Sequence, residues 1–168
     1  MTEHPLEAMP PAYWQGIQEF NQQQFYACHD TLEAIWMESL EPEKTFYQGL
    51  LQIAVALYHL GNHNLRGAII LLGEGTNRLR RYPDDFGGIN LDRLRQEARS
   101  LQSSLQSQFI QEPKSEVTHP TDQTHDQLAW ILPTIEVWSA EGLSAEGLSA
   151  EGLSAEGLPA AEQPEHQS

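Results

Sequence analysis

Hydrophobic residues recur every three or four positions through the first two-thirds of the chain, as they do in amphipathic helices. The pattern predicts helices at about residues 13–20, 25–38, 43–60, 65–82 and 91–109. No stretch alternates convincingly with the period of two that marks a half-buried strand. We therefore expect an all-α fold, a small bundle of about five helices over residues 10–110.

Residues that favour helix ends separate these segments. Pro42 suits the first turn of a helix, and Asn64 and Asn90 suit the N-cap position, where a side-chain oxygen accepts a backbone N–H. Pro83 is expected to stop the fourth helix. Within the helices, Gly49 is small enough to let two helices approach each other closely.

After about residue 113 the composition changes. Residues 114–127 are polar and lack periodicity, and Ser-Ala-Glu-Gly-Leu then repeats four times over residues 139–158. The glycine in each repeat disfavours a helix by about 1 kcal/mol. We therefore expect residues 111–168 to form a disordered, acidic, low-complexity tail that the bundle does not need in order to fold.

A short apolar island, from Leu128 to Trp138, interrupts this tail. One interpretation is that the tail is merely solvated. The other is that the island is a docking peptide and the repeat is a spacer beyond it, in which case Trp130, Ile131 and Trp138 are the expected contact residues.

The charge of the chain argues against nucleic acid as a partner. The formal net charge is -15 at pH 7. Residues 1–112 carry 8 Lys and Arg against 14 Asp and Glu, a net charge of -6, and residues 113–168 carry 1 against 10, a net charge of -9. Such a chain repels phosphate backbones.

Three further features favour a cytoplasmic location. The single cysteine, Cys28, excludes an internal disulfide and fits a reducing compartment. No basic segment followed by an apolar one opens the chain, so a secretory leader is not expected. The longest apolar stretch, around residues 50–60, is too short to cross a bilayer, so we expect no membrane partner.

An ordered set of residues runs through the first four predicted helices. It comprises Phe20, Asn21, Phe25, Tyr26, His29, Asp30, Leu32, Glu33, Trp36, Phe46, Gly49, Leu50, Gln52, Ala54, Tyr58, His59, Asn64, Gly67 and Ala68. This set, over roughly residues 12–82, resembles domain-of-unknown-function family 309, a bacterial and plastid family. The resemblance implies a small all-helical bundle, and it implies no activity.

Candidate chemistry lies inside the second and third predicted helices. His29 and Glu33 are four residues apart, and Gln52 and His59 are seven apart, so each pair shares one face of its helix. One interpretation is a buried network, joined by Asn64, that satisfies polar groups between packed helices. The others are acid–base catalysis without a metal, and a metal site in which His29, Glu33 and His59 bind zinc or iron and activate water.

The residues around this set have simpler expected roles. Asp30 lies about 100° around the helix from His29, so we expect it to face solvent rather than to act as a partner. Cys28, on the apolar face, is expected to be a core residue rather than a nucleophile. Tyr58, like Trp14 and Trp36, is expected to be a core aromatic.

Arg78, Arg80 and Arg81 cluster before Pro83. One interpretation is that these cations complement the negative end of the fourth helix. The other is an anion or acidic-partner patch that Arg93 and Arg95 would extend, with the acidic tail as a possible occupant.

The leading interpretation is a non-catalytic interaction or structural module that needs no cofactor and binds an unidentified protein. The alternative is a small metal-dependent, hydrolase-like enzyme with water activated near His29, Glu33 and His59. The enzyme requires these three side chains to converge on one point beside an open cleft.

Overall fold

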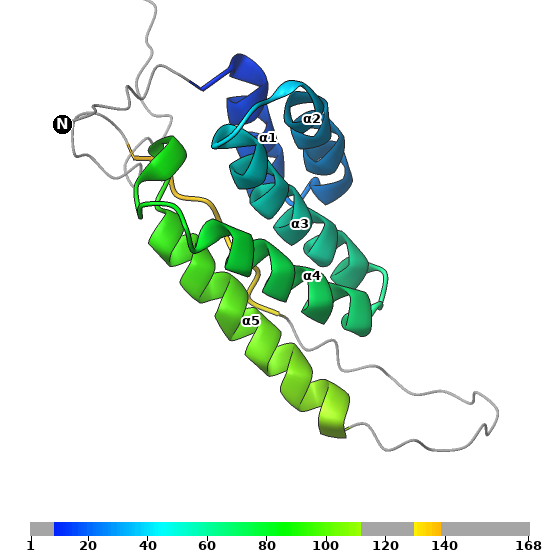
Figure 1. The fold of residues 1–168 in the computed structure, drawn as a ribbon. Coiled ribbons are helices and arrows are strands. Elements are labelled where there is room, and N and C mark those ends of the chain that lie inside the picture. The colour runs from blue at the N-terminus through cyan, green and yellow to red at the C-terminus, as the bar shows by residue number, and fades with distance from the viewer. Residues whose placement is uncertain (1–8, 112–129, 139–168) are drawn as a thin grey trace, which may run out of the picture.

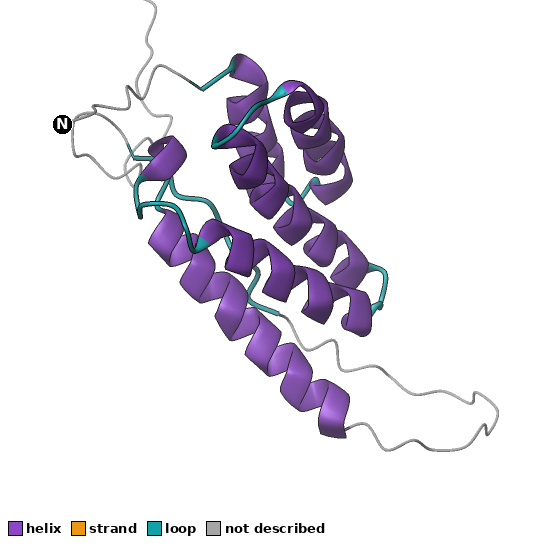
Figure 2. Cartoon of the chain, viewed as in Figure 1, coloured by secondary structure: helices purple, strands orange, loops and turns teal. Residues whose placement is uncertain are grey.

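The structure, a computed structural model, describes residues 9–111 and 130–138. Five α-helices and one short 3₁₀ helix occupy these residues: α1 (Pro11–Asn21), α2 (Phe25–Glu38), α3 (Glu43–Gly61), α4 (Leu65–Leu79), η2 (Phe86–Gly88) and α5 (Leu91–Gln111). The all-α prediction is confirmed, and Figure 2 shows only helices and loops in the described part of the chain. The four Ser-Ala-Glu-Gly-Leu repeats lie outside the described residues.

Each helix packs against the next one along the chain, and α3 lies at the centre of the bundle (Figure 1). Large side chains at helical spacing fill the space between the helices. The largest that are fully buried are Tyr13, Phe20, Leu32, Phe46, Leu50, Ile53, Leu72, Leu79, Ile89, Leu91, Leu94 and Leu105. Cys28 is also buried and free, as expected. Burial of these apolar groups is the main stabilising term of such a bundle.

The helix ends follow local capping chemistry. Asn64 Oδ1 accepts the backbone N–H of Gly67 at 2.9 Å, and Asn90 Oδ1 accepts that of Arg93 at 3.1 Å. Both predicted N-caps are therefore confirmed. In each case the side chain satisfies one of the backbone donors that the first turn of a helix leaves unpaired.

The end of α4 is stabilised by a side chain from another helix. Arg95, buried on α5, donates from Nη1 to the carbonyl oxygens of Leu79 and Tyr82, each at 3.2 Å. Its Nη2 pairs with Asp84. Arg95 therefore belongs to the core of the fold and does not extend an anion patch. Its positive charge lies at the carboxyl end of α4, where the helix dipole makes a cation favourable.

Two glycines set the close contact of α3 with α4. A Cβ atom on Gly75 would lie 2.8 Å from the carbonyl oxygen of Gly49, and one on Gly49 would lie 2.7 Å from the side chain of Leu79. A Cβ atom at Gly75 would require the backbone of α3 to move, and one at Gly49 would require the Leu79 side chain to move. The close approach expected at Gly49 is thus present, and Gly75 is its counterpart on α4.

Residues 130–138, the docked segment, lie along the bundle and correct the expectation of a tail separate from it. The segment runs beside α5 and is the yellow trace in Figure 1. Ile89 and Val137 form an antiparallel bridge, in which Asn90 N–H donates to the Glu136 carbonyl at 2.8 Å and Trp138 N–H to the Gly88 carbonyl at 2.9 Å. The part of the apolar island that the structure describes, residues 130–138, is therefore docked on its own chain.

The residues that anchor the docked segment differ from the expected ones. Ile135 is 2% exposed and belongs to the core, and Pro133 is buried. Trp130 packs partly against the core, whereas Trp138 is 47% exposed and Ile131 is 90% exposed. The hydrophobic pattern of the island did not identify Ile135, because its contact surface lies far away in the sequence.

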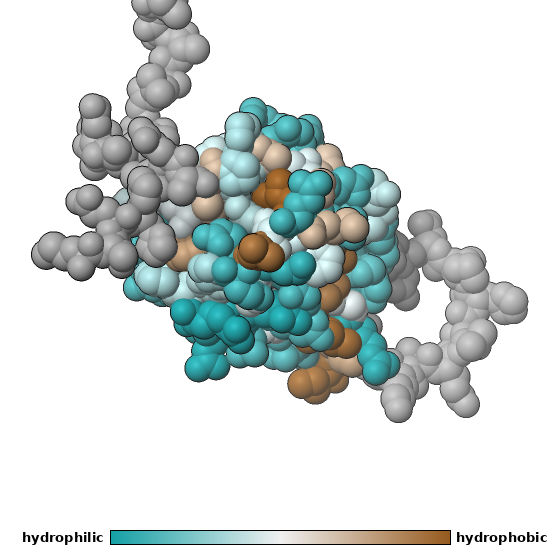
Figure 3. All heavy atoms as spheres, turned by 45° about the horizontal axis from the view of Figure 1, so that its top comes forward, coloured by the Kyte–Doolittle hydropathy of each residue, from teal (hydrophilic) through white to brown (hydrophobic). Residues whose placement is uncertain are grey.

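None of the helices in the described ranges is both long and apolar enough to cross a membrane. The face shown in Figure 3 is mostly hydrophilic, with isolated hydrophobic side chains between the polar ones.

Candidate functional site: an aromatic groove beside an acidic helix

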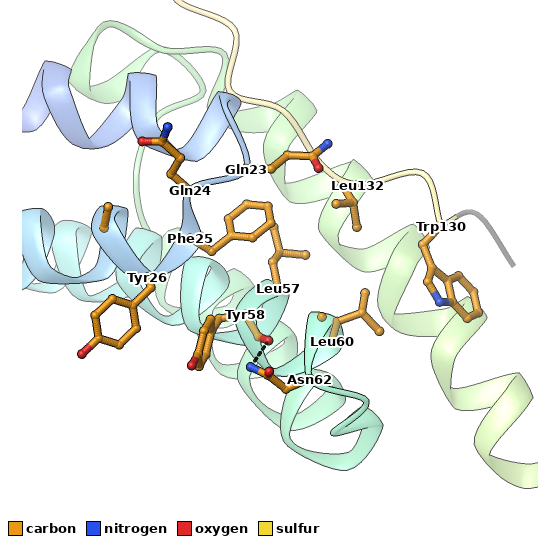
Figure 4. Close-up of a pocket in the computed structure, with 12 residues that line it drawn as sticks. Gln23, Gln24, Phe25, Tyr26, Leu57, Tyr58, Leu60, Asn62, Trp130 and Leu132 are labelled. Atoms are coloured by element: carbon orange, nitrogen blue, oxygen red, sulfur yellow. Dashed lines mark hydrogen bonds between the residues drawn. The ribbon is translucent and has the colours of Figure 1, made fainter. Parts of the chain in front are cut away.

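An apolar groove opens where three parts of the chain meet. The turn into α2, the last turns of α3 and the beginning of the docked segment form its walls, which enclose about 770 Å³. The apolar and aromatic side chains in the lining are Phe25, Tyr26, Ala27, Leu57, Tyr58, Leu60, Trp130 and Leu132 (Figure 4). A groove of this size and composition is typical of a binding site.

Two tyrosines form one end of the groove. The rings of Tyr26 on α2 and Tyr58 on α3 have centroids 5.6 Å apart and planes inclined by 53°. Tyr26 is 61% exposed and Tyr58 is 41% exposed, so Tyr58 is not the core residue that the sequence suggested. Large exposed aromatic rings of this kind are common at protein interfaces.

The lining of the groove carries no charged residue. Its polar groups are the neutral amides of Gln23, Gln24 and Asn62 and the tyrosine hydroxyls. Asn62 is held in place by its own helix, because its Nδ2 donates to the Tyr58 carbonyl at 3.0 Å. The groove therefore suits an apolar ligand surface with uncharged polar edges.

Beside Tyr26, the exposed side of α2 carries a histidine and two carboxylates. His29, Asp30 and Glu33 each offer a ligand atom, and these atoms all lie within 4.8 Å of one another. His29 Nδ1 lies 3.1 Å from Asp30 Oδ1. Asp30 faces solvent as expected, but it is also the partner of His29, which corrects the sequence-based expectation.

Gln52 joins α3 to α4. Its Nε2 donates to Glu74 Oε2 at 2.9 Å, and its Oε1 accepts from Arg78 Nε at 2.8 Å. Both partners lie on α4, so Gln52 does not contribute to a network with the polar residues of α2.

His59 belongs to the end of α3. Its Nδ1 lies 3.3 Å from Asn64 Nδ2, beside the cap of α4. Within the described residues, His59 does not join the His29 cluster. The expected single network is therefore three separate groups, centred on His29, Gln52 and His59. Seven residues along a helix is about 10 Å, which places Gln52 and His59 beside different neighbours even though they share a face.

The arginines expected to form an anion patch are also divided. Arg78 donates a hydrogen bond to Gln52, and Arg93 pairs with Glu97 at 2.8 Å and with Glu136 at 3.3 Å. Arg80 and Arg81 are exposed beyond the end of α4.

The groove residues Tyr26, Trp130 and Leu132 were not identified as one site from the sequence. The position of Tyr26 beside Phe25 did not mark it as exposed, because successive aromatic residues on a helix can both be buried, as Phe46 and Tyr47 are. No local signal connects Trp130 with α2 and α3.

Residues 13–71 match the family described as "Domain of unknown function (DUF309)". The "Uncharacterized protein YpuF" of Bacillus subtilis is 34% identical over 83 residues, which cover 46% of this chain and 48% of that protein. An "Uncharacterized protein" of Aquifex aeolicus is 31% identical over 77 residues, which cover 45% of this chain and 23% of that protein. The match thus spans about half the length of the first relative and a quarter of the second.

The match to the family, over residues 13–71, covers nearly all of α1, all of α2 and α3, and the first half of α4. It therefore includes the two tyrosines, the His29 cluster, Gln52 and His59. It does not include α5 or the docked segment. Over residues 13–71, this chain is therefore similar to DUF309 domains, and it is distantly similar to two uncharacterized bacterial proteins.

Proposed function

We propose that this chain is a non-catalytic interaction module whose aromatic groove binds an amphipathic helix of a partner protein. Apolar side chains of the partner helix enter the groove, and basic side chains beside them lie against α2. The observation that carries the proposal is the pair of exposed tyrosines at an uncharged, apolar groove. An amphipathic helix in an apolar groove is a common mode of recognition.

The charge of α2 supports a basic partner. This helix carries Asp30, Glu33 and Glu38 and has neither lysine nor arginine. The larger part of the chain is itself acidic. Opposite charge at the rim of an interface selects among partners and speeds association more than it adds affinity. We therefore assign the specificity to α2 and the affinity to the groove.

A designed peptide helix tests this assignment. The peptide carries leucines at positions i, i+3, i+4 and i+7 and lysines beside them, and a matched peptide carries glutamates in place of the lysines. We expect calorimetry to show binding of the lysine peptide, with Tyr58→Ser weakening it about tenfold because a large aromatic contact is lost. Ile70→Ser, which changes an exposed apolar residue of α4 outside the groove lining, is the matched control.

Three results would contradict the proposal. One is equal loss of affinity in the Tyr58→Ser and Ile70→Ser variants. The second is tighter binding of the glutamate peptide. The third is self-association of the full chain, seen in sedimentation, that Tyr58→Ser abolishes, since the occupant of the groove would then be a second copy.

A second candidate function rests on the cluster at His29. His29, Asp30 and Glu33 fit a divalent cation by ligand type and by their mutual approach within 4.8 Å. They all come from about one turn of one helix, so such an ion would retain open positions toward solvent, as a hydrolytic metal requires. Elemental analysis of the purified protein tests this candidate. Stoichiometric zinc or iron that Glu33→Gln removes would favour the enzyme over the module.

We place the module in the cytoplasm, with a protein rather than nucleic acid or a membrane as its partner. The buried free thiol of Cys28 is compatible with a reducing compartment. The net charge of residues 1–112 supports the exclusion of nucleic acid. Micromolar, salt-sensitive binding to arbitrary duplex DNA would contradict this part of the proposal.

A further inference from the structure

The geometry points to a binding site for a phosphate-type oxyanion in a second hollow, between α4 and α5. The hollow encloses about 520 Å³, and its lining contains two arginines, Arg80 and Arg99, and no acidic residue. It shares no lining residue with the aromatic groove, so this inference is independent of the proposed function.

The two arginines are the cations that the rest of the fold leaves available here. Within the described part of the chain, neither the Arg80 nor the Arg99 side chain makes a hydrogen bond or an ion pair. By contrast, Arg78, Arg93 and Arg95 all have partners. In an acidic chain, two unpaired guanidinium groups that share a hollow without a carboxylate form a local positive site.

The helical register brings the polar groups of this hollow together. Gly73, Thr76 and Asn77 on α4 and Arg80, the C-cap residue directly after it, follow i, i+3, i+4 and i+7. Arg99, Gln102 and Ser103 follow i, i+3 and i+4 on α5. Residues at these spacings share one face of a helix. The carboxyl end of α4 and one face of α5 therefore each present one arginine and additional polar groups to the same hollow.

Contacts between the helices fix the width of the hollow. Gln102 Nε2 donates to the Ile69 carbonyl at 3.0 Å. This contact depends on Gly73, because a Cβ atom there would lie 2.6 Å from Gln102 Nε2. The hydroxyl of Thr76 donates to the Leu72 carbonyl at 2.7 Å. Gln102 and Thr76 are thus engaged with the backbone, and the side chains of Asn77 and Ser103 remain as donors beside the two arginines.

The chemistry of these groups favours phosphate over a single carboxylate. A guanidinium group donates two parallel hydrogen bonds to an oxyanion, and a tetrahedral phosphate has enough oxygens to accept from two such groups at once. A bound dianion also offsets the repulsion between the two arginines. Because both side chains are exposed, solvent and salt weaken the interaction, and we expect a dissociation constant for inorganic phosphate of about 1 mM.

Titration with inorganic phosphate tests the site. The full chain, labelled with ¹⁵N, is titrated at pH 7.5 and constant ionic strength, and the Nε–Hε signals of the arginines are followed by NMR. We expect saturable shifts for Arg80 and Arg99. Arg80→Gln and Arg99→Gln should each weaken binding about tenfold because each removes one charged donor pair. Arg66→Gln, which changes an exposed arginine outside the hollow, should leave binding unchanged.

Two results would overturn the proposal. The first is a linear, unsaturable response, or an equal loss of binding in the Arg66→Gln and Arg99→Gln variants, either of which indicates general charge screening. The second concerns the carboxylates of the chain itself. A full-length variant carries glutamine at Glu141, Glu146, Glu151 and Glu156. If it binds phosphate more than about tenfold tighter than the natural chain, the occupant is the chain's own acidic repeat rather than a phosphorylated ligand.

Discussion

The side-chain amide of Asn21 pairs with the backbone of Ile135 in both directions. Ile135 N–H donates to Asn21 Oδ1 at 2.7 Å, and Asn21 Nδ2 donates to the Ile135 carbonyl at 2.7 Å. A single amide at the end of α1 thus satisfies both backbone groups of the residue that anchors the docked segment. Because Asn21 contacts the backbone of the segment, this contact fixes the position of the segment whatever side chain is present at position 135.

Asn21→Ala should loosen the docked segment. It removes both hydrogen bonds and leaves the partly buried backbone groups of Ile135 without a partner, at a cost of about 1–3 kcal/mol. We expect a lower urea midpoint and faster hydrogen exchange at Ile135. Gln22→Ala, an exposed neighbour whose side chain makes no hydrogen bond in the described structure, is the control. Equal stability of the two variants would show that the amide pair contributes nothing.

Arg95→Met should destabilise the junction of α4 and α5. Methionine retains most of the apolar stem but leaves the carbonyls of Leu79 and Tyr82 unsatisfied, so we expect a loss of about 1–3 kcal/mol in the free energy of unfolding. Denaturant unfolding measures the loss. Arg66→Met, on the exposed side of α4, should change stability by less than about 0.5 kcal/mol.

Gly75→Ala should destabilise the chain, whereas Gly61→Ala should not. At Gly75 the added methyl group meets the backbone of α3, and overpacking of this kind costs about 1–3 kcal/mol. At Gly61 a Cβ atom meets nothing within 4 Å. That substitution should be neutral or stabilising by up to about 1 kcal/mol, because alanine favours the helix. Thermal melts of the two variants decide this, and a destabilised Gly61→Ala with an unaffected Gly75→Ala would refute the packing argument.

Cys28 should be unreactive in the folded chain. Burial, with the carboxylate of Glu19 as the smaller cause, raises the pKa of its thiol from 9.0 to about 12. At pH 8 the thiolate fraction is then roughly a thousandfold lower than in the unfolded chain, so labelling by a disulfide reagent should be slow until urea is added. Fast labelling of the folded chain would contradict the burial of Cys28.

The same pKa shift predicts a loss of stability in alkali. A group whose pKa is raised by folding stabilises the folded chain fully below its unfolded pKa, and this contribution is lost as the pH rises toward the folded pKa. The contribution of Cys28 is lost between pH 9.0 and about pH 12. Burial also raises the pKa of Tyr47 from 10.0 to about 12, so Tyr47 acts in the same direction. Melting temperatures should therefore fall above pH 9, and they should fall less steeply in Cys28→Ala.

The helices and their ends could be predicted because the responsible interactions are local. Asn64 and Asn90 cap the backbone three residues away, and the apolar spacing of each helix defines its own buried face. The partner of Gln52 could not be predicted in this way. The sequence indicates that a polar group on an apolar helix needs a partner, but the packing of α3 between α2 and α4 decides which helix supplies it.

The residues of the candidate site could be identified only from the tertiary structure, for the same reason. Tyr26 and Tyr58 lie on different helices, and Trp130 belongs to a segment that is anchored beside α1 through Ile135. Composition correctly identified the apolar island within an acidic stretch. It did not reveal that Ile135, between the exposed Thr134 and the half-buried Glu136, is a residue of the segment that the core buries.

The pairing of Asn21 with Ile135 also has a consequence for the order of folding. The two residues are 114 positions apart, so closing this contact before the helices have formed would sacrifice the entropy of a very long loop. The helical hairpins should therefore assemble first, and the docked segment should add to a nearly complete bundle. Weakening this contact should speed unfolding and leave the folding rate almost unchanged, so the segment mainly prolongs the lifetime of the folded chain.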